Sequence, residues 1–272
     1  MRVIKLAGIV SIFILIATIA ILYILPVKNS KKSIPTHLLF AHRAISPYFP
    51  ENSLESMEYL AKQGVKGIEI DVRKTLDHQW VLFHDPDGFR MLGIDDEIQN
   101  LKFADWSKHG LIFSGNQTES SIPLLETVFQ KFSDSIILYL DIKETSFLNA
   151  REIVRLIKLY KLERSIIIAS TNAVFILYIK LVYPEMLVAL EGFNAGKELL
   201  YSLLPGFLLP DYLSSFHYKT NISHVNWLKE RSLLDLKIVY DVDTSSMEKV
   251  KSMGFTNIIA DYDSIMFMNF SK

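Results

Sequence analysis

Two segments of the chain bring together side chains that can bind a cation, bind a phosphate and transfer protons. The first contains AHR at residues 41–43 and PEN at residues 50–52, and the second, residues 68–86, contains Glu69, Asp71 and His84. Carboxylates bind hard cations, the guanidinium of arginine forms paired hydrogen bonds to phosphate, and imidazole titrates near neutral pH. These residue types predict a site that holds a cation, binds a phosphate and moves a proton on and off oxygen.

Glu69 and Asp71 lie two residues apart in the apolar run GIEIDV at residues 67–72. Alternate residues of a strand project to the same face, so the two carboxylates share a face. Buried carboxylates that lie side by side repel each other unless a cation neutralises them. The pair therefore indicates a metal ion or a basic partner, and the alternative is a pair of solvent-facing acids on an edge strand.

A second polar pair, Asp141 and Lys143, follows the apolar residues 136–140. Asp141 would add a third oxygen ligand to Glu69 and Asp71, and Lys143 would add a cation for phosphate. A set made of oxygen ligands favours calcium or magnesium over zinc. We therefore predict a site for Ca²⁺ or Mg²⁺.

His42 and His84 are predicted to carry the protons, because one imidazole can accept a proton near neutral pH while the other donates one. Either histidine alone would more often be a structural or surface residue. Two histidines at strand ends that face the same acids favour acid/base chemistry.

Arg43 is suited to bind a phosphate, and its alternative role is a salt bridge to Glu51. Asn52 or Ser53 fits the N-cap of the helix that follows. This assignment leaves Glu51 free to reach the site in a supporting role.

Short β-branched runs alternate with stretches of helical periodicity, a pattern that predicts a parallel sheet with helices outside it. The nine strand-like runs are residues 38–42, 67–72, 81–84, 136–142, 165–170, 186–190, 212–216, 237–241 and 257–260. The helical stretches are residues 53–63, 124–132, 149–160, 173–182, 225–232 and 245–253.

The third strand-like run must return antiparallel to the second, because the connection between Val72 and Trp80 is too short for a parallel crossover. A turn centred between Asp77 and His78 would place Asp71 directly opposite His84. The eight remaining strands predict a TIM (β/α)8 barrel with a β-hairpin at its mouth. Active sites of such barrels lie at the carboxyl ends of the strands, where the reactive residues of this chain fall.

The segment from Leu6 to Leu25 is uncharged and long enough to span a bilayer as a helix. It is longer than the apolar part of a typical signal peptide, and it is too uniformly apolar for a usual core helix. We therefore predict residues 1–33 to be a membrane anchor and linker, and residues 34–272 to be one barrel domain. We expect a single-pass membrane protein whose catalytic domain is extracytoplasmic.

Composition excludes several classes of function. The formal net charge is −1, so no broad cationic surface for nucleic acid is expected. The chain has no cysteine, which excludes thiol catalysis, structural disulfides and sulfur-ligated zinc. Neither composition nor motifs indicate the oligomeric state.

In order and spacing, these motifs resemble those of the glycerophosphodiester phosphodiesterase family of barrel enzymes, which carry HRG, PEN, G-x-E-x-D-V, VxxHD and E-x-K. This chain reads AHRA, PENS, GIEIDV, VLFHDP and LDIKE, and its SIPLLETV and MGFTNIIADY segments also match. The likeness covers residues 38–264. It implies that Glu69, Asp71 and Asp141 bind the metal, that His42 and His84 are the acid/base pair, that Arg43 and Lys143 contact phosphate, and that Glu51 supports the site.

Three positions depart from the family pattern. Ala44 replaces the glycine of HRG, so we expect this turn not to adopt a positive φ easily. Asp141 replaces the usual glutamate and is one methylene shorter, which we expect to weaken or shift the third metal contact. His78 stands where the family usually has glycine, which changes the hairpin turn.

We expect a metal-dependent phosphodiesterase that hydrolyses glycerophosphodiesters to glycerol 3-phosphate and an alcohol. One alternative is a lysophospholipase D or sphingomyelinase D-like activity on membrane lipids, because an anchor would place the site near lipid. A sphingomyelinase D-like enzyme would ordinarily contain disulfides. Another alternative is a catalytically weakened, membrane-tethered barrel that binds lipid.

Overall fold

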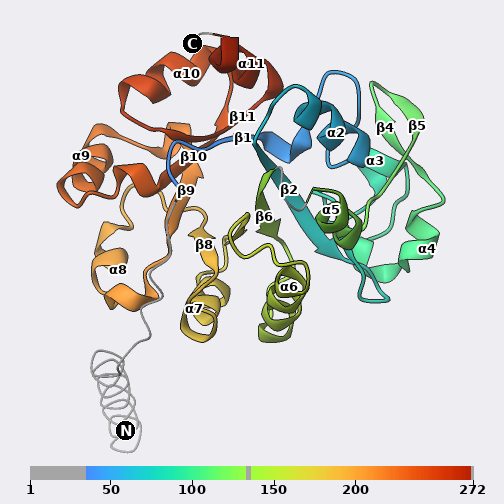
Figure 1. Cartoon of the computed structure of the whole chain (residues 1–272), viewed down its shortest axis with the longest axis horizontal. Helices are drawn as coiled ribbons and strands as arrows, with labels where there is room; N and C mark the ends of the chain where they lie inside the picture. The colour runs from blue at the N-terminus through green and yellow to red at the C-terminus, as the bar shows by residue number, and fades with distance from the viewer. Residues whose placement is uncertain (1–34, 133–135, 271–272) are drawn as a thin grey trace, which may run out of the picture.

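Eight parallel strands form a closed barrel in the computed structural model, which describes residues 35–132 and 136–270 (Figure 1). The strands are β1 (Leu39–Ala41), β2 (Gly67–Lys74), β6 (Ile137–Ile142), β7 (Ile166–Ser170), β8 (Leu187–Leu190), β9 (Tyr212–Phe216), β10 (Lys237–Val242) and β11 (Asn257–Ala260). Because β1 pairs with both β2 and β11, the sheet closes on itself. The predicted barrel and all its strands are confirmed.

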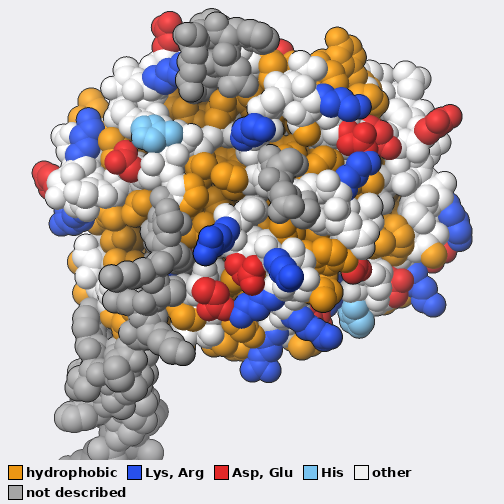
Figure 2. Space-filling view, in the orientation of Figure 1, with side chains coloured by type: hydrophobic (Ala, Val, Ile, Leu, Met, Phe, Trp, Pro, Cys, Tyr) orange, Lys and Arg blue, Asp and Glu red, His pale blue; other side chains and the backbone are white. Residues whose placement is uncertain are grey.

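Helices surround the barrel and follow its strands along the chain. They are α2 (Leu54–Lys62), α5 (Leu125–Phe132), α6 (Phe147–Leu159), α7 (Ala173–Val182), α8 (Glu198–Ser202), α9 (Ile222–Glu230), α10 (Thr244–Ser252) and α11 (Tyr262–Phe270). The six predicted helices are present with small shifts at their ends, whereas α8 and α11 were not predicted. Figure 2 shows one face of the molecule, on which Lys and Arg side chains are mixed with Asp and Glu side chains and with hydrophobic patches.

Strand alternation separates the residues inside the barrel from those under the helices. Ile68, Ile70 and Val72 of β2 belong to the large hydrophobic core that the helices share with the strands. Glu69 and Asp71 therefore point to the barrel interior. In the parallel pair of β2 with β6, Asp71 is aligned with Asp141. The register places these carboxylates at one level of the barrel.

The predicted hairpin is formed by β2 and β3 (Trp80–Leu82), but its register differs by one residue from the prediction. Lys74 pairs with Trp80, and the loop between them is centred on Asp77, whose Oδ1 accepts hydrogen bonds from Thr75 Oγ1 (2.6 Å) and the Phe103 N–H (2.9 Å). Asp71 consequently lies opposite Phe83, whose N–H donates to the Asp71 carbonyl (3.0 Å).

The prediction that Asp71 lies directly opposite His84 is therefore wrong. An odd number of loop residues moves the pairing by one position, which reverses the face of every paired side chain. His84 follows the end of β3, so strand pairing does not determine its orientation.

Residues 83–124 form an insertion between β3 and α5 that was not predicted. It contains α3 (Phe89–Leu92), α4 (Phe103–Trp106) and a two-stranded sheet of β4 (Gly110–Phe113) and β5 (Asn116–Ser121). A separate hydrophobic cluster around buried Trp106 holds these elements together. Elements of four to six residues are too short for hydrophobic periodicity to identify them.

The membrane anchor and linker predicted for residues 1–33 lie outside the described residues. None of the helices in the described part of the chain combines the length and the hydropathy needed to cross a bilayer.

We predict that Asn257→Ala lowers the free energy of unfolding by about 2–4 kcal/mol. Buried Asn257 lies where the barrel closes: its Oδ1 accepts from the Leu38 N–H (2.9 Å), and its Nδ2 donates to the Asp235 carbonyl (2.6 Å). The substitution leaves both backbone groups without these partners. Urea unfolding measures the effect, and exposed Asn116→Ala is the control. A loss below about 0.5 kcal/mol would mean that this side chain does not stabilise barrel closure.

Candidate active site

A cavity of about 280 Å³ opens at the carboxyl ends of the barrel strands. Seven of the eight predicted site residues line it: His42, Arg43, Glu69, Asp71, His84, Asp141 and Lys143. The eighth, Glu51, contacts the site from outside this lining. The structure therefore brings together groups that are about one hundred residues apart in the chain.

Three carboxylates form the centre of the cavity. Glu69, Asp71 and Asp141 each offer an oxygen, and these atoms all lie within 4.8 Å of one another. Lys143 Nζ forms ion pairs with Asp71 Oδ1 (2.8 Å) and with Asp141. The shorter aspartate at position 141 still reaches the group. Three clustered carboxylate oxygens fit a hard divalent cation such as Ca²⁺ or Mg²⁺.

Electrostatics at this cluster favour a bound cation. Burial and the neighbouring charge of Asp71 raise the pKa of Glu69 well above its ordinary value. Burial also raises the pKa of Asp141, against the opposing effect of Lys143. For Asp71 the effect of burial is outweighed by Lys143 and by hydrogen bonds, so its pKa is lowered. A divalent cation would stabilise the ionised form of all three acids.

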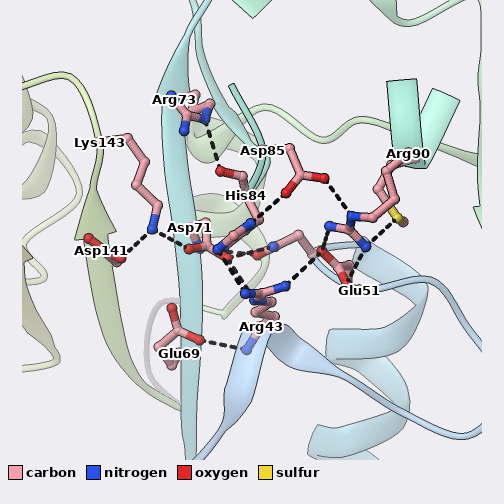
Figure 3. A network of polar contacts seen from close by, with 12 residues as sticks. Arg43, Glu51, Glu69, Asp71, Arg73, His84, Asp85, Arg90, Asp141 and Lys143 are labelled. Atoms are coloured by element: carbon pink, nitrogen blue, oxygen red, sulfur yellow. Dashed lines mark hydrogen bonds and ion pairs between the residues drawn. The ribbon is translucent and has the colours of Figure 1, made fainter. Parts of the chain in front are cut away.

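The turn after β1 directs two groups of Arg43 into the site (Figure 3). Its N–H donates to Glu69 Oε2 (2.6 Å), and its Nη2 donates to His84 Nε2 (2.8 Å). Arg43 and Ala44 both have φ of 50°. The turn therefore adopts a positive φ without glycine, at a cost of about 1–2 kcal/mol per residue, which is the penalty that the expectation for Ala44 was based on.

A chain of ionic contacts orients His84 (Figure 3). His84 Nδ1 donates to Asp85 Oδ1 (2.7 Å), which leaves Nε2 to face Arg43. Arg90, from α3 of the insertion, donates to Asp85 Oδ2 (2.5 Å) and to both oxygens of Glu51 (2.6 and 3.0 Å). Glu51 also lies 3.7 Å from Arg43 Nη1.

Glu51 thus supports the site through two arginines. Asp85 and Arg90 were not predicted from the sequence. The position of Asp85 next to His84 is a signal that could have identified it, whereas no local pattern marks Arg90.

Asn52 and Ser53, which the sequence left as alternatives for the N-cap, have separate roles. Ser53 Oγ accepts from the Ser56 N–H (3.2 Å) and is the N-cap of α2. Asn52 has φ of 53° and binds Asp71 twice: its Nδ2 donates to Asp71 Oδ2 (3.0 Å), and its Oδ1 accepts from the Asp71 N–H (3.1 Å). Asn52 therefore fixes the position of one candidate metal ligand.

His42 lines the cavity together with His84. Burial, reinforced by the charge of Arg43, lowers the pKa of His42. Its imidazole is consequently neutral at pH 7 and is able to accept a proton.

The wall formed by β7–β11 carries residues that were not predicted from the sequence: Thr171, Glu191, Phe216, Tyr240, Asp241 and Ile259. Glu191 Oε1 accepts a hydrogen bond from Tyr139 Oη (3.0 Å), and burial together with the charge of Asp141 raises the pKa of Glu191 to about 8. A lone glutamate after an apolar strand is a weak sequence signal.

We predict that Glu191 makes the metal-free protein less stable as the pH rises. The folded protein keeps this proton up to about pH 8, whereas the unfolded chain loses it near the ordinary pKa of 4.5. The unfolded state then binds fewer protons, so the free energy of unfolding falls with pH across this window. Thermal unfolding with chelator between about pH 5 and pH 8 should show a steeper fall in Tm for the unmodified protein than for Glu191→Gln. Equal slopes would contradict the prediction, and exposed Glu230→Gln is the control.

Comparison with known proteins gives consistent matches. Residues 42–195 match the family model described as the glycerophosphoryl diester phosphodiesterase family. A glycerophosphodiester phosphodiesterase of Caldanaerobacter subterraneus subsp. tengcongensis is 27% identical over 247 residues, which cover 82% of this chain and 93% of that protein. A human lysophospholipase D is 25% identical over 265 residues, which cover 84% of this chain and 83% of that protein.

Solved structures share the barrel. A phosphodiesterase of Oleispira antarctica, in complex with the product sn-glycerol-3-phosphate, aligns with a TM-score of 0.72 at 22% identity and covers 88% of this chain and 98% of that chain. A glycerophosphodiester phosphodiesterase of Parabacteroides distasonis aligns with a TM-score of 0.69 at 23% identity, with coverage of 86% and 97%. The family model spans more than half of the chain. The chain therefore belongs to the glycerophosphoryl diester phosphodiesterase family and is a phosphoric diester hydrolase.

Proposed function

We propose that this enzyme hydrolyses glycerophosphodiesters to glycerol 3-phosphate and an alcohol, with the aid of a divalent cation. The observation that carries the proposal is the cluster of Glu69, Asp71 and Asp141 beside two histidines and Arg43 in one cavity. The Oleispira relative holds sn-glycerol-3-phosphate, which is the product expected here. The cavity is slightly smaller than the roughly 300–1,000 Å³ of sites for drug-sized ligands, which suits a small polar substrate.

In this proposal Glu69, Asp71 and Asp141 would hold Ca²⁺ or Mg²⁺. When bound there, the cation would supply Lewis-acid chemistry, which polarises a phosphoryl oxygen and lowers the pKa of an attacking water or hydroxyl group. Arg43 and Lys143 provide positive charge for the non-bridging phosphate oxygens. Lys143 forms ion pairs with Asp71 and Asp141, which supports a role for its ammonium group beside the metal in this proposal.

The two histidines complete the proton transfers. One accepts the proton of the attacking oxygen, and the other protonates the oxygen of the leaving alcohol as the phosphorus–oxygen bond breaks. Asp85 accepts a hydrogen bond from His84 Nδ1, and Nε2 of that ring accepts one from Arg43 Nη2 (2.8 Å). In this proposal Arg43 turns to the phosphate when substrate binds, which frees Nε2 to carry the proton that is transferred. Neutral His42 is suited to the acceptor role.

Lysophospholipids are the second candidate substrates. A human relative is named a lysophospholipase D. Large exposed hydrophobic side chains also lie shortly after the carboxyl ends of β6, β7 and β9, at the same end of the barrel as the cavity: Phe147, Leu148, Val174, Tyr218 and Ile222. These side chains could contact an acyl chain that extends out of the cavity.

We predict that His42→Ala and His84→Ala each lower kcat on glycerophosphocholine by at least about 10²-fold, because each removes a group that transfers a proton. The measurement is release of glycerol 3-phosphate at saturating substrate with Ca²⁺ or Mg²⁺. His109 lies in the insertion, so the control variant His109→Ala should retain normal turnover. Near-normal kcat in either cavity variant would exclude that histidine from acid/base catalysis.

We predict that a chelator abolishes this activity and that added Ca²⁺ or Mg²⁺ restores it. Asp141→Asn should weaken binding of the cation at least about tenfold, because it removes the charge of one ligand, whereas Asp141→Glu should retain binding. Isothermal titration calorimetry with each metal measures the affinity without turnover. Exposed Asp95→Asn is the control, and unchanged affinity in Asp141→Asn would exclude this residue as a ligand.

A further inference from the structure

The cavity wall opposite the carboxylate cluster has its own chemistry. In the closed barrel β9 is four strands away from β2, so the ends of β8, β9 and β10 face the side that carries Glu69 and Asp71. Glu191, Phe216, Tyr240 and Asp241 line the cavity from these three neighbouring strands. We call these four residues the far wall.

An irregularity in β10 brings two consecutive residues into the far wall. Neighbouring residues of a regular strand point to opposite faces, yet Tyr240 and Asp241 both line the cavity. The pairing of β10 with β11 shifts between Val239 and Val242, and Asp241 has φ of 62°. Such bulges redirect side chains next to active sites.

The aromatic part of the far wall is a corner made by two rings. The ring centroids of Phe216 and Tyr240 lie 4.4 Å apart with an interplanar angle of 59°. Lys219 does not line the cavity, but its Nζ lies 4.8 Å from the Phe216 ring centroid. The ring of Phe216 is thus already in contact with an ammonium group.

No ion-pair contact holds the acidic part of the far wall, although the charge of Lys143 acts on Glu191 at longer range. Within residues 35–132 and 136–270, neither Glu191 nor Asp241 forms a salt bridge. Glu191 is held by Tyr139 Oη, which also contacts Ser214 Oγ (3.0 Å).

When the positive and negative groups in the cavity are paired, no positive group is assigned to Glu191 or Asp241. Under the proposed function, the divalent cation and Lys143 match the three carboxylates of the metal cluster, and Arg43 matches the phosphodiester. Asp241 then remains without a positive partner, although it lines the same cavity as the substrate. Glu191 keeps its proton up to about pH 8 while no cation lies beside it, and a cation bound against it would favour its ionised form.

We propose that the far wall selects glycerophosphodiesters with a cationic head group, of which choline and ethanolamine are the simplest. This inference rests on the proposed function and names the substrate class of the same site. Aromatic faces attract quaternary ammonium groups, and a carboxylate at the same position adds charge complementarity. Glu191 and Asp241 are specificity-determining residues in this assignment, and neither takes part in proton transfer.

The test compares two substrates that share the glycerophosphoryl group and differ in the head group, which is a quaternary ammonium in one and an uncharged glycerol in the other. The ratio of kcat/KM for glycerophosphocholine to that for glycerophosphoglycerol is measured by release of glycerol 3-phosphate. We expect the enzyme to favour glycerophosphocholine at least about tenfold, and we expect Glu191→Gln and Tyr240→Leu each to reduce this ratio by about fivefold or more. Glu230→Gln, which lies outside the cavity, should leave the ratio unchanged.

A second readout does not need turnover of the cationic substrate. Tetramethylammonium should inhibit hydrolysis of glycerophosphoglycerol competitively, and the inhibition should weaken in Glu191→Gln. Circular dichroism melts of each variant establish that the barrel is folded before the ratios are compared.

The outcomes separate the inference from the proposed function. The cationic subsite would be overturned if kcat/KM were equal for the two substrates. It would also be overturned if the ratio of the two kcat/KM values in a variant equalled that of the unmodified enzyme. In both cases the phosphodiesterase activity would stand. Equal losses on both substrates in Glu191→Gln would assign this residue to general positioning and would also overturn it. If neither substrate is hydrolysed with Ca²⁺ or Mg²⁺, the proposed function itself fails.

Discussion

The confinement of three carboxylates at one level of the barrel interior is the constraint on which the rest of the site depends. Glu69 and Asp71 share a face of β2, and parallel pairing aligns Asp71 with Asp141 of β6. Groups of like charge at this separation oppose ionisation unless positive charge or hydrogen-bond donors are supplied. Lys143, the N–H of Arg43 and the amide of Asn52 are those donors. The same demand for positive charge makes the cluster suitable for a divalent cation.

The insertion and the hairpin complete the site from the other side. The hairpin brings the chain to His84 but ends before it, so side-chain contacts must hold the imidazole. Arg90 of the insertion joins Asp85 to Glu51, which links the ring of His84 to the PEN turn. The insertion, which resembles a peripheral addition, therefore supplies Arg90, and Arg90 positions the candidate catalytic residue His84.

Part of the backbone strain lies around the cavity. Of the nine non-glycine residues with positive φ in the described part of the chain, four are at the site: Arg43, Ala44, Asn52 and Asp241. Each turns a backbone or side-chain group toward the site, and each costs up to about 1–2 kcal/mol that surrounding contacts must offset. Buried Ala44 shows that the family's glycine is not required for this turn, because the core around it maintains the conformation.

The sequence by itself determined the barrel, its strand order and seven of the residues that line the cavity. These features follow from local alternation, from the short β2–β3 connection and from motif spacing, which are properties of neighbouring residues. It could not determine the hairpin register, because one loop residue more or less reverses the face of every paired side chain. The length of the loop depends on how Thr75 and Phe103 hold Asp77 by hydrogen bonds.

Only the tertiary structure decided the positions of Arg90 and of the far wall. Arg90 contacts Asp85 and Glu51 beside the cavity, and the far wall lines it, in both cases from elements that are distant in the chain. The bulge in β10 also breaks the alternation that a sequence pattern assumes. The reason is that strand periodicity specifies which face a residue occupies, whereas the contacts between distant elements specify which groups meet across a cavity.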